Sequence, residues 1–490
     1  MAQSITKNVF YNVLLNIASV IFPLITAPYI SRVLEPDGVG LYNFATTYAG
    51  YFALVAMLGI PTYGVREVSK ARDNKETLTK LISQLMSIAA ITTLAVSIIY
   101  LLSIALIGQL TENYIIFLIA GFVIYLAPFK INWYYQGIED FGFITKVSLI
   151  VKTLSVICLF IFVHDKNDLI IYVILSVLGG VLADVWNYVK MWKSGIRPKL
   201  TLEGLKSHIN PLLILFASSI AVSIYTVLDT LMLGFIKDYE EVGYYTNAMH
   251  ISKVILYAVT SLSIVAVPRV SYYMKNKDYE NINLLMNKSF SVVSFLAFPV
   301  AIGLACITPT FVPLFFGVKF IGSIIPLMVL SMLIIAIGLN NLTGVQMLIG
   351  MGLDKLFLYS VLVGTISNVI LNAILIPLWG ATGASIASVV AETLILLVTI
   401  YFVYHRTKIR INKWIDVIKA LMGALLFIPL IFFLKTVLEG WSLVVAFVFI
   451  GCVVYILAEY ILRNGSISLF WNVVDNSLNS IRNKIKKDSL

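Results

Sequence analysis

Fourteen long apolar stretches alternate with short polar connections along this 490-residue chain, and its basic residues lie almost entirely on one side of the alternation. The stretches lie near residues 9–31, 40–62, 81–107, 114–134, 145–163, 168–189, 210–235, 243–268, 289–311, 320–347, 356–378, 381–404, 414–435 and 441–462. At about 1.5 Å per residue, each can cross about 30 Å of hydrocarbon as a helix. Of the 35 Lys and Arg residues, 28 lie on the side that holds both termini, 5 lie on the other side, and Lys152 and Lys253 lie inside stretches. The pattern predicts an all-α membrane protein with 14 transmembrane helices and both termini in the cytoplasm.

Composition excludes a soluble domain and argues against a nucleic-acid partner. Hydrophobic residues make up 60% of the chain, charged residues make up 12%, and the mean hydropathy is +0.94. The net charge of +10 is spread over short connections beside apolar helices, where it suits the anionic lipids of the inner leaflet. We therefore expect a lipid bilayer as the surroundings and no nucleic acid as a partner.

The residues that enzymes use are too scattered to suggest catalysis. The outer connections are short, the three cysteines lie in apolar stretches, and the four histidines lie far apart in sequence. No grouping with metal-ligand spacing, and no nucleophile with a nearby base, stands out. We expect no catalytic residues, no cofactor and no metal, which disfavours a membrane glycan polymerase or ligase.

A short internal repeat suggests a duplicated architecture. The segment Val39–Ala45 follows the first stretch and Val242–Ala248 follows the seventh, at an offset of 203 residues, and both share Val-Gly-x-Tyr-x-x-Ala. An even number of spans separates the copies, so the halves have parallel topology, as expected for a pseudo-two-fold axis along the membrane normal. We predict two pseudo-symmetric six-helix lobes around a central cavity, plus two C-terminal helices. The predicted parts are an N-terminal lobe over 1–206, a C-terminal lobe over 207–408, the last two spans over 409–463 and a cytoplasmic amphipathic tail over 464–490.

Two ionisable residues are predicted to lie near mid-membrane, where charge is costly and often functional. Lys253 falls about ten residues into the eighth stretch, which places it about 15 Å from the outer end. Glu392 falls at a similar depth in the twelfth stretch. Lys253 is a candidate for lining a substrate cavity, and a buried ion pair with Glu392 is the structural alternative. Glu392 itself is a candidate for ion pairing or for coupling to a cation.

Other polar residues in or beside the spans complete the candidate cavity. Lys152 lies above the inner end of the fifth stretch, where it can line a cavity or extend toward the interface. Arg32, the only arginine on the outer side, ends a first stretch that contains Pro23 and Pro28. It can pair locally with an acidic neighbour or hold a phosphate with two hydrogen bonds. Asp229, Asn16 and Asn247 are the remaining candidates, and packing between helices is the alternative for each.

Several motifs resemble those of a known transporter family. They are Ser31–Leu34, Gly38–Tyr42, Asp229–Gly234, Val242–Tyr245, Ala248–Lys253 and Gly380–Ala384. In this order and topology they resemble the signatures of polysaccharide repeat-unit flippases of the O-antigen and capsule type. Those flippases belong to the multidrug/oligosaccharidyl-lipid/polysaccharide exporter superfamily.

This resemblance implies a function, a location and a set of partners. The family moves an undecaprenyl-pyrophosphate-linked oligosaccharide from the inner to the outer leaflet of the cytoplasmic membrane, through a cationic cavity between two lobes. The resemblance maps this cavity onto Arg32, Lys253 and Lys152 and implies a glycan polymerase and glycosyltransferases as candidate partners. A cation-coupled multidrug exporter or a lipid II exporter of the same superfamily is the alternative, although the first stretch lacks the acidic residue that multidrug exporters usually carry there.

A duplicated transporter of this kind is expected to work by alternating access, with the lobes rocking about a central site. Pro23 and Pro28 give the first span places to bend. Gly38 and Gly40 are expected to absorb changes in backbone dihedral angles in the turn that follows.

Overall fold

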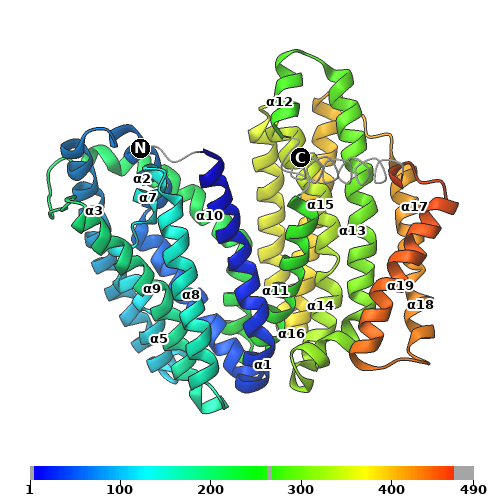
Figure 1. Cartoon of the computed structure of the whole chain (residues 1–490), viewed down its shortest axis with the longest axis horizontal. Helices are drawn as coiled ribbons and strands as arrows, with labels where there is room; N and C mark the ends of the chain where they lie inside the picture. The colour runs from blue at the N-terminus through cyan, green and yellow to red at the C-terminus, as the bar shows by residue number, and fades with distance from the viewer. Residues whose placement is uncertain (1–4, 262–266, 468–490) are drawn as a thin grey trace, which may run out of the picture. The chain divides into compact units, whose positions relative to one another are not determined.

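The computed structural model describes residues 5–261 and 267–467, and every regular element within these ranges is helical (Figure 1). This confirms the predicted all-α fold. Two compact units divide the chain, Met1–Gly243 and Tyr244–Leu490. The predicted lobe boundaries stay predictions.

Nine helices in the described ranges are long and apolar enough to cross a membrane. Two of them, α1 (Ile5–Met57) and α16 (Asp354–Arg406), have 53 residues each. Each is broken by one non-helical residue, Glu35 (φ 63°) in α1 and Gly380 (φ 52°) in α16. Both helices therefore contain two of the predicted stretches, and the count of fourteen spans stays a prediction. The turn in α1 lies at Glu35, whereas the sequence predicts that Gly38 and Gly40 absorb changes in backbone dihedral angles in this turn.

The first unit contains α1 to α10 and the first turn of α11. The elements that follow α1 are α2 (Ile60–Ala71), α3 (Lys75–Leu106), α4 (Gly108–Thr111), α5 (Tyr114–Ala120), α6 (Phe122–Tyr125), η1 (Ala127–Phe129), α7 (Asn132–Gly137), α8 (Phe141–Phe162), η2 (Lys166–Asp168), α9 (Leu169–Lys193) and α10 (Lys206–Ile236). Within this unit α1 packs against α3, α8 and α10. Aromatic rings fill the contact between α1 and its neighbours, with Phe44 edge-on to Phe117 and Tyr48 against Tyr100.

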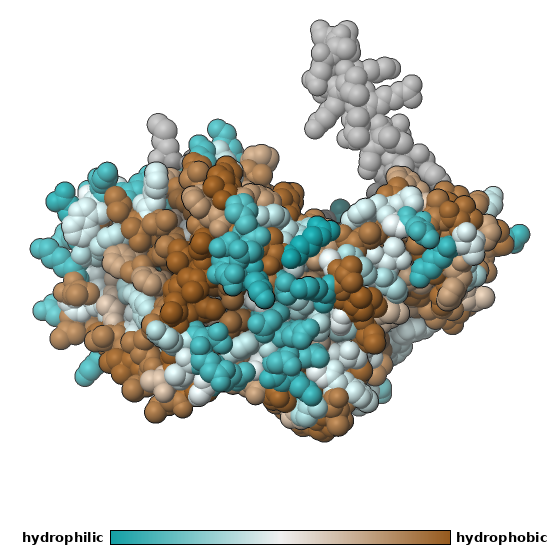
Figure 2. Space-filling model, turned by 90° about the horizontal axis from the view of Figure 1, so that it is seen from below, coloured by the Kyte–Doolittle hydropathy of each residue, from teal (hydrophilic) through white to brown (hydrophobic). Residues whose placement is uncertain are grey.

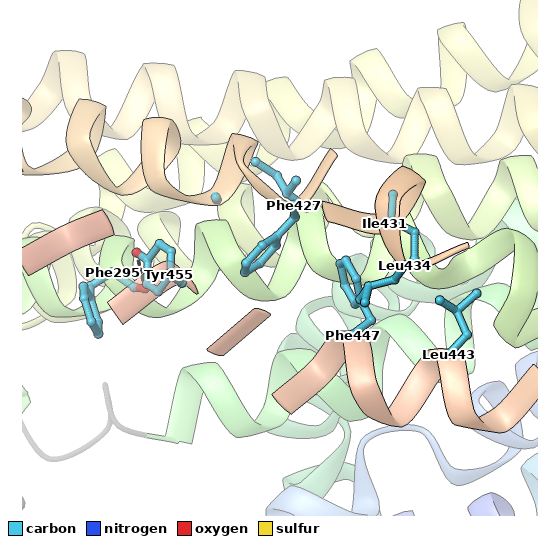
Figure 3. Close-up of a cluster of buried hydrophobic side chains, with 9 residues drawn as sticks. Phe295, Phe427, Ile431, Leu434, Leu443, Phe447 and Tyr455 are labelled. Atoms are coloured by element: carbon cyan, nitrogen blue, oxygen red, sulfur yellow. Dashed lines mark hydrogen bonds between the residues drawn. The ribbon is translucent and has the colours of Figure 1, made fainter. Parts of the chain in front are cut away.

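The second unit contains the rest of α11 and the elements up to α19. They are α11 (Tyr239–Ser261), α12 (Val267–Lys275), α13 (Tyr279–Phe315), η4 (Val318–Ser323), α14 (Ile324–Leu330), α15 (Leu333–Asn340), the π-helix η5 (Asn341–Ile349), α16, α17 (Trp414–Leu425), α18 (Phe427–Leu434) and α19 (Gly440–Ile461). The last three helices pack against α13. Figure 3 shows the apolar cluster at this contact, where the Tyr455 hydroxyl also donates a hydrogen bond to the Phe295 carbonyl at 2.8 Å.

Two predicted spans are less regular than their hydropathy suggests. The stretch near 114–134 is divided among α5, α6, η1 and α7, and Pro128 in η1 has no backbone N–H to continue a helix. The stretch near 320–347 begins in a 3₁₀-helix and ends in the π-helix η5. Hydropathy detects that these segments are apolar but carries no information on how their helices are wound.

Much of the exposed surface is apolar, as lipid-facing helices require. Figure 2 shows broad hydrophobic areas on one face of the molecule, beside hydrophilic areas across its middle. On α19, Phe449 is 72% exposed and Val453 is 56% exposed, although both lie in the middle of an apolar helix. Such large exposed apolar surface suits hydrocarbon as the surroundings and not water.

The segment between α9 and α10 lies along α3 as an ordered strap. The Lys199 and Thr201 amides donate to the Ser83 and Ser87 hydroxyls at 3.1 and 2.9 Å. Gln84, between the two serines, donates to the Glu203 carbonyl at 3.1 Å. Polar side chains on one face of α3 therefore supply hydrogen bonds to the backbone of an extended segment that has no neighbouring strand.

His208, at the start of α10, fastens the end of this strap. Its Nε2 lies 3.0 Å from Gln84 Oε1, and its Nδ1 lies 2.8 Å from the Tyr63 hydroxyl. These contacts suit the neutral ring with its proton on Nε2. Burial lowers the pKa of His208 below its ordinary value, and the nearby Glu67 carboxylate only partly opposes this effect.

The stability of the first unit is therefore predicted to decrease as the pH falls, because His208 becomes protonated. Because the folded-state pKa is lowered, the neutral ring stabilises the fold above the unfolded pKa of about 6.5, and this contribution is lost as the pH falls below it. The melting temperature of the detergent-solubilised protein, measured from pH 8 to pH 5, should decrease toward the acid end. In the His208→Gln variant the decrease should be smaller. An equal slope in both proteins would assign the pH dependence to other groups.

Candidate substrate-binding site

In the first unit, the candidate basic residues lie on or against α1. Lys152 extends from α8 toward α1, where its Nζ donates to the Ser19 hydroxyl at 2.9 Å, and its side chain is partly buried. Arg32 lies on α1 three residues before the turn at Glu35 and is exposed. A lysine amine at this depth in the apolar part of a helix bundle is costly, and a single hydroxyl satisfies only one of its three N–H groups. Lys152 thus retains donors for a further polar group beside α1.

Asp229 is the acidic candidate of this unit and lies in the C-terminal half of α10. Its side chain is 6% exposed, and it is close enough to Tyr51 on α1 to interact with it electrostatically. Tyr51 also donates to the Ser223 carbonyl at 2.8 Å, which links α1 to α10. The candidate Asn16 lies on α1, but its side chain is outside the described residues.

In the second unit, α11 carries Asn247 and Lys253. Asn247 is 4% exposed, whereas Lys253 is only partly buried. Lys253 lies near enough to His250 for an electrostatic interaction. Ser252 is 1% exposed, and its hydroxyl has no hydrogen-bond partner among the described residues. The helix therefore brings a cation and several buried polar groups to one region of the second unit.

Glu392 lies in the buried face of α16. Its side chain is 7% exposed, and its Oε2 has no hydrogen-bond partner among the described residues. One turn earlier, Ser388 is 3.2 Å from the Tyr245 hydroxyl of α11. Two turns later, Thr399 is 2.7 Å from the Thr343 hydroxyl of the π-helix η5. Glu392 therefore lies between two hydrogen-bonded polar pairs on one face of α16.

These polar pairs were not predicted from the sequence. The signal that was present is the spacing of Ser388, Glu392 and Thr399, which places them on one face of a helix. Their partners on α11 and η5 depend on how three helices pack, which the sequence pattern does not specify. Regularly spaced polar residues in an apolar span thus indicate a helix face that forms polar contacts with neighbouring helices.

The structure distributes the six placed candidates between the two units. Arg32, Lys152 and Asp229 belong to the first unit, and Asn247, Lys253 and Glu392 belong to the second. A single cavity formed by both sets stays a prediction. Among the described residues, no group of three or more His, Cys, Asp or Glu side chains is arranged to hold a metal ion.

Comparison with known proteins identifies relatives in glycan transport. A family model described as "Polysaccharide biosynthesis protein" matches residues 5–274. An Escherichia coli (strain K12) protein named for O-antigen transport is 23% identical over 404 residues, which cover 82% of this chain and 97% of that protein. A Haloferax volcanii protein named for flipping in low-salt glycan biosynthesis is 23% identical over 295 residues, which cover 58% of this chain and 60% of that protein.

Solved structures show the same fold. The lipid II flippase MurJ, in an inward closed conformation, matches with a TM-score of 0.71 at 17% identity and covers 92% of this chain and 98% of that one. An inward-facing multidrug-resistance transporter of the same superfamily matches with a TM-score of 0.58 at 14% identity and covers 79% of this chain and 93% of that one. Together with the apolar helices, these relatives show a multi-pass membrane protein.

Because Glu392 Oε2 has no hydrogen-bond partner among the described residues, we predict little energetic coupling between the side chains of Glu392 and Lys253. Breaking a buried ion pair by removing one partner typically costs about 3–5 kcal/mol, because the other charge stays buried alone. With Glu392→Gln, Lys253→Gln and the double variant, the changes in unfolding free energy should add to within about 0.5 kcal/mol. Chemical denaturation in detergent measures them. A coupling energy above about 2 kcal/mol would instead establish the buried ion pair.

Proposed function

The chain belongs to the polysaccharide biosynthesis protein family, and on this premise we propose that it moves an undecaprenyl-pyrophosphate-linked oligosaccharide from the inner to the outer leaflet of the cytoplasmic membrane. The proposal covers a location in the inner membrane with both termini in the cytoplasm. It also covers alternating access as the mechanism and a non-enzymatic role. Relatives named for O-antigen transport and for glycan flipping support it.

The observation that carries the proposal is the amine of Lys152 inside the apolar helix α8, where its Nζ donates to a hydroxyl on α1. Lys253 supplies a second amine, on α11. A pyrophosphate carries about two negative charges, and basic groups attract it much more strongly in a low-dielectric cavity than in water. The sugars need hydrogen-bonding groups such as Asn247, while the prenyl chain can remain in lipid. The candidate partners are glycosyltransferases, which make the linked glycan, and a glycan polymerase, which consumes it.

The buried carboxyl of Glu392 favours a second feature of the proposed transport, its coupling to a cation. A carboxyl with one buried oxygen lacking a hydrogen bond is stable when it is protonated or when it holds a cation. We include this group in the proposal as the site where a coupling cation is exchanged. A cation-coupled multidrug exporter or a lipid II exporter with the same fold would use it in the same way, so Glu392 does not identify the substrate.

Replacing Lys253 provides the direct test of the cationic site. Lys253→Ala should reduce glycan export by at least about 100-fold, since about 3 kcal/mol of attraction to the pyrophosphate is lost. Lys253→Arg should retain partial export, because charge matters more than shape for a mobile diphosphate. Export is measured as surface glycan in cells that lack their own flippase, with membrane insertion checked by protein level.

The matched control is Lys355→Ala, which removes an exposed lysine at the start of α16. This variant should export as the unmodified protein does. Normal export by Lys253→Ala would remove the residue from the substrate site. Export of normal amount but altered chain length would instead indicate a glycan polymerase.

A further inference from the structure

The strap along α3, residues 194–205, has a counterpart in the second unit. There the segment between α16 and α17, residues 407–413, lies along α13. The Arg410 and Asn412 amides donate to the side-chain oxygens of Asn283 and Asn287 at 2.8 and 2.7 Å. In both units, therefore, alternate amides of an extended segment bond to side chains one helical turn apart. We call the two segments the first strap and the second strap.

The shared pattern of hydrogen bonds sets a correspondence between residues of the two units. On the helices, Ser83 of α3 corresponds to Asn283 of α13, which is numbered 200 higher. On the straps, Leu200 corresponds to Ile411, which is numbered 211 higher. Ile411 is 2% exposed and lies just before α17, whereas Leu200 is 78% exposed and Leu202 is 81% exposed. The first strap thus leaves uncovered an apolar position that the second unit buries.

The same correspondence applies to the helix faces beyond the straps. On α13, Ser291 donates to Asp416 of α17 at 3.0 Å, and Phe298 and Ile302 pack in the apolar cluster formed with α17, α18 and α19. The residues numbered 200 lower on α3 are each about half exposed: Ile91, Ile98 and Leu102. The face that the last three helices cover on α13 is therefore exposed on α3.

The residue types on the two faces indicate different neighbours. Small and polar residues drive the packing of helices in membranes, and α13 has Ser291 hydrogen-bonded to Asp416 at its contact with α17. At the corresponding positions, α3 has only the aliphatic residues Ile91, Ile98 and Leu102. Aliphatic side chains gain as much from contact with acyl chains as from contact with another helix. Lipid is therefore the neighbour that suits the exposed face of α3.

The first strap lies beside the first apolar turns of α3. Lys80 is the last charged residue of this helix, and Ser87, which accepts from the strap, follows it by seven residues, about 10 Å along the axis. The head-group layer of one leaflet is about 5–8 Å thick. Leu200 and Leu202 therefore lie near the boundary between head groups and acyl chains. The extended backbone is tolerated at this depth because side chains of α3 hydrogen-bond to it.

The first strap also carries the charge that an anionic head group would meet. From Lys193 to Lys206 the chain has four basic residues and one acidic residue, Glu203. Arg197 and Lys199 are exposed beside the two leucines, and the Arg197 guanidinium lies over the ring of the exposed Trp192, 6.0 Å from its centroid. Tryptophan is typical of the membrane interface. Basic, aromatic and aliphatic side chains thus occur together at one end of α3.

We propose that the first strap and the adjoining face of α3 form a binding site for an anionic phospholipid. Arg197 and Lys199 attract its phosphate head group. Leu200, Leu202 and the exposed residues of α3 contact its acyl chains. The orientation given under the proposed function places this lipid in the inner leaflet, and the binding itself does not depend on that function. The second unit has no such site at the corresponding surface within the described residues, because α17 and α19 pack there.

Quenching by brominated lipids tests the contact with acyl chains. In a background with the three native cysteines replaced by Ala, Leu202→Cys is labelled with a nitrobenzoxadiazole fluorophore, and the whole protein is placed in lipid nanodiscs. Phosphatidylglycerol with brominated chains should quench this label. A label on Asp73→Cys, in the exposed turn before α3, should stay unquenched. A label on Val453→Cys, exposed in the middle of α19, should be quenched equally by brominated phosphatidylglycerol and phosphatidylcholine.

A titration of the two brominated lipids tests the head-group preference. Half-maximal quenching at Leu202→Cys should need at least about fivefold less phosphatidylglycerol than phosphatidylcholine, since each basic residue near the surface strengthens the attraction. Arg197→Gln combined with Lys199→Gln should abolish this preference. The matched control, Lys275→Gln combined with Lys355→Gln, removes the same charge from exposed positions of the second unit and should retain the preference. This control separates a site at the strap from the general attraction of a basic protein to anionic lipid.

Three results would overturn the lipid site. The first is equal quenching of the Leu202→Cys label by both lipids, and the second is a preference that survives the loss of Arg197 and Lys199. The third is a label shielded from water but not quenched by either lipid, which would show that a second copy or a partner helix covers the surface. Leu200→Cys supplies a second labelling position if Leu202→Cys does not fold. No glycan takes part in these measurements, so their failure would leave the proposed function untouched.

Discussion

Lipid cannot hydrogen-bond to a peptide group, and the rest of this structure depends on that constraint. Each backbone N–H and C=O within the hydrocarbon must be satisfied inside the protein, which leaves helices as the solution for a chain of this hydropathy. The described residues are accordingly helical wherever they are regular. Helices of similar apolar character gain little from contact with one another, so close approach and polar contacts must decide how they pack. Buried polar pairs such as Ser388 with Tyr245 and Thr343 with Thr399 are therefore specific features of the packing in the second unit.

Because lipid cannot hydrogen-bond to a charged side chain either, ionisable groups within the apolar helices are costly and point to binding. Lys152 lies in an apolar helix and donates to the Ser19 hydroxyl, and among the described residues one oxygen of Glu392 has no hydrogen-bond partner. Neither arrangement is the most stable one that the positions allow, because an apolar residue of similar size would cost less. Such groups are retained where they bind or carry something. An anionic lipid-linked glycan for the amines and a cation for the carboxyl fit the chemistry of each.

Sequence reasoning succeeded where the signal is periodic and failed where it depends on packing. Hydropathy predicted the all-α membrane fold because burial in lipid acts on every residue of a span. It placed the connection between the first two spans at residues 32–39 but did not show that the backbone turns there at a single residue, Glu35. Gly38 and Gly40 were predicted to serve backbone freedom, but a glycine can serve either backbone freedom or close approach, and only coordinates distinguish the two: a Cβ on Gly40 would lie 1.6 Å from the Tyr239 carbonyl oxygen. The acceptor of Lys152 depends on the rotation of α8 against α1, which hydropathy does not determine.

The most direct measurement uses purified protein in liposomes that carry an undecaprenyl-pyrophosphate-linked oligosaccharide in both leaflets. A membrane-impermeant glycosidase added outside digests only the glycan exposed on the outer leaflet. The account predicts that digestion continues beyond the initially exposed half when the protein is present, and that it stops there in protein-free liposomes. Digestion that stops at the same half in both samples, with the protein shown to be folded and inserted, would contradict the account.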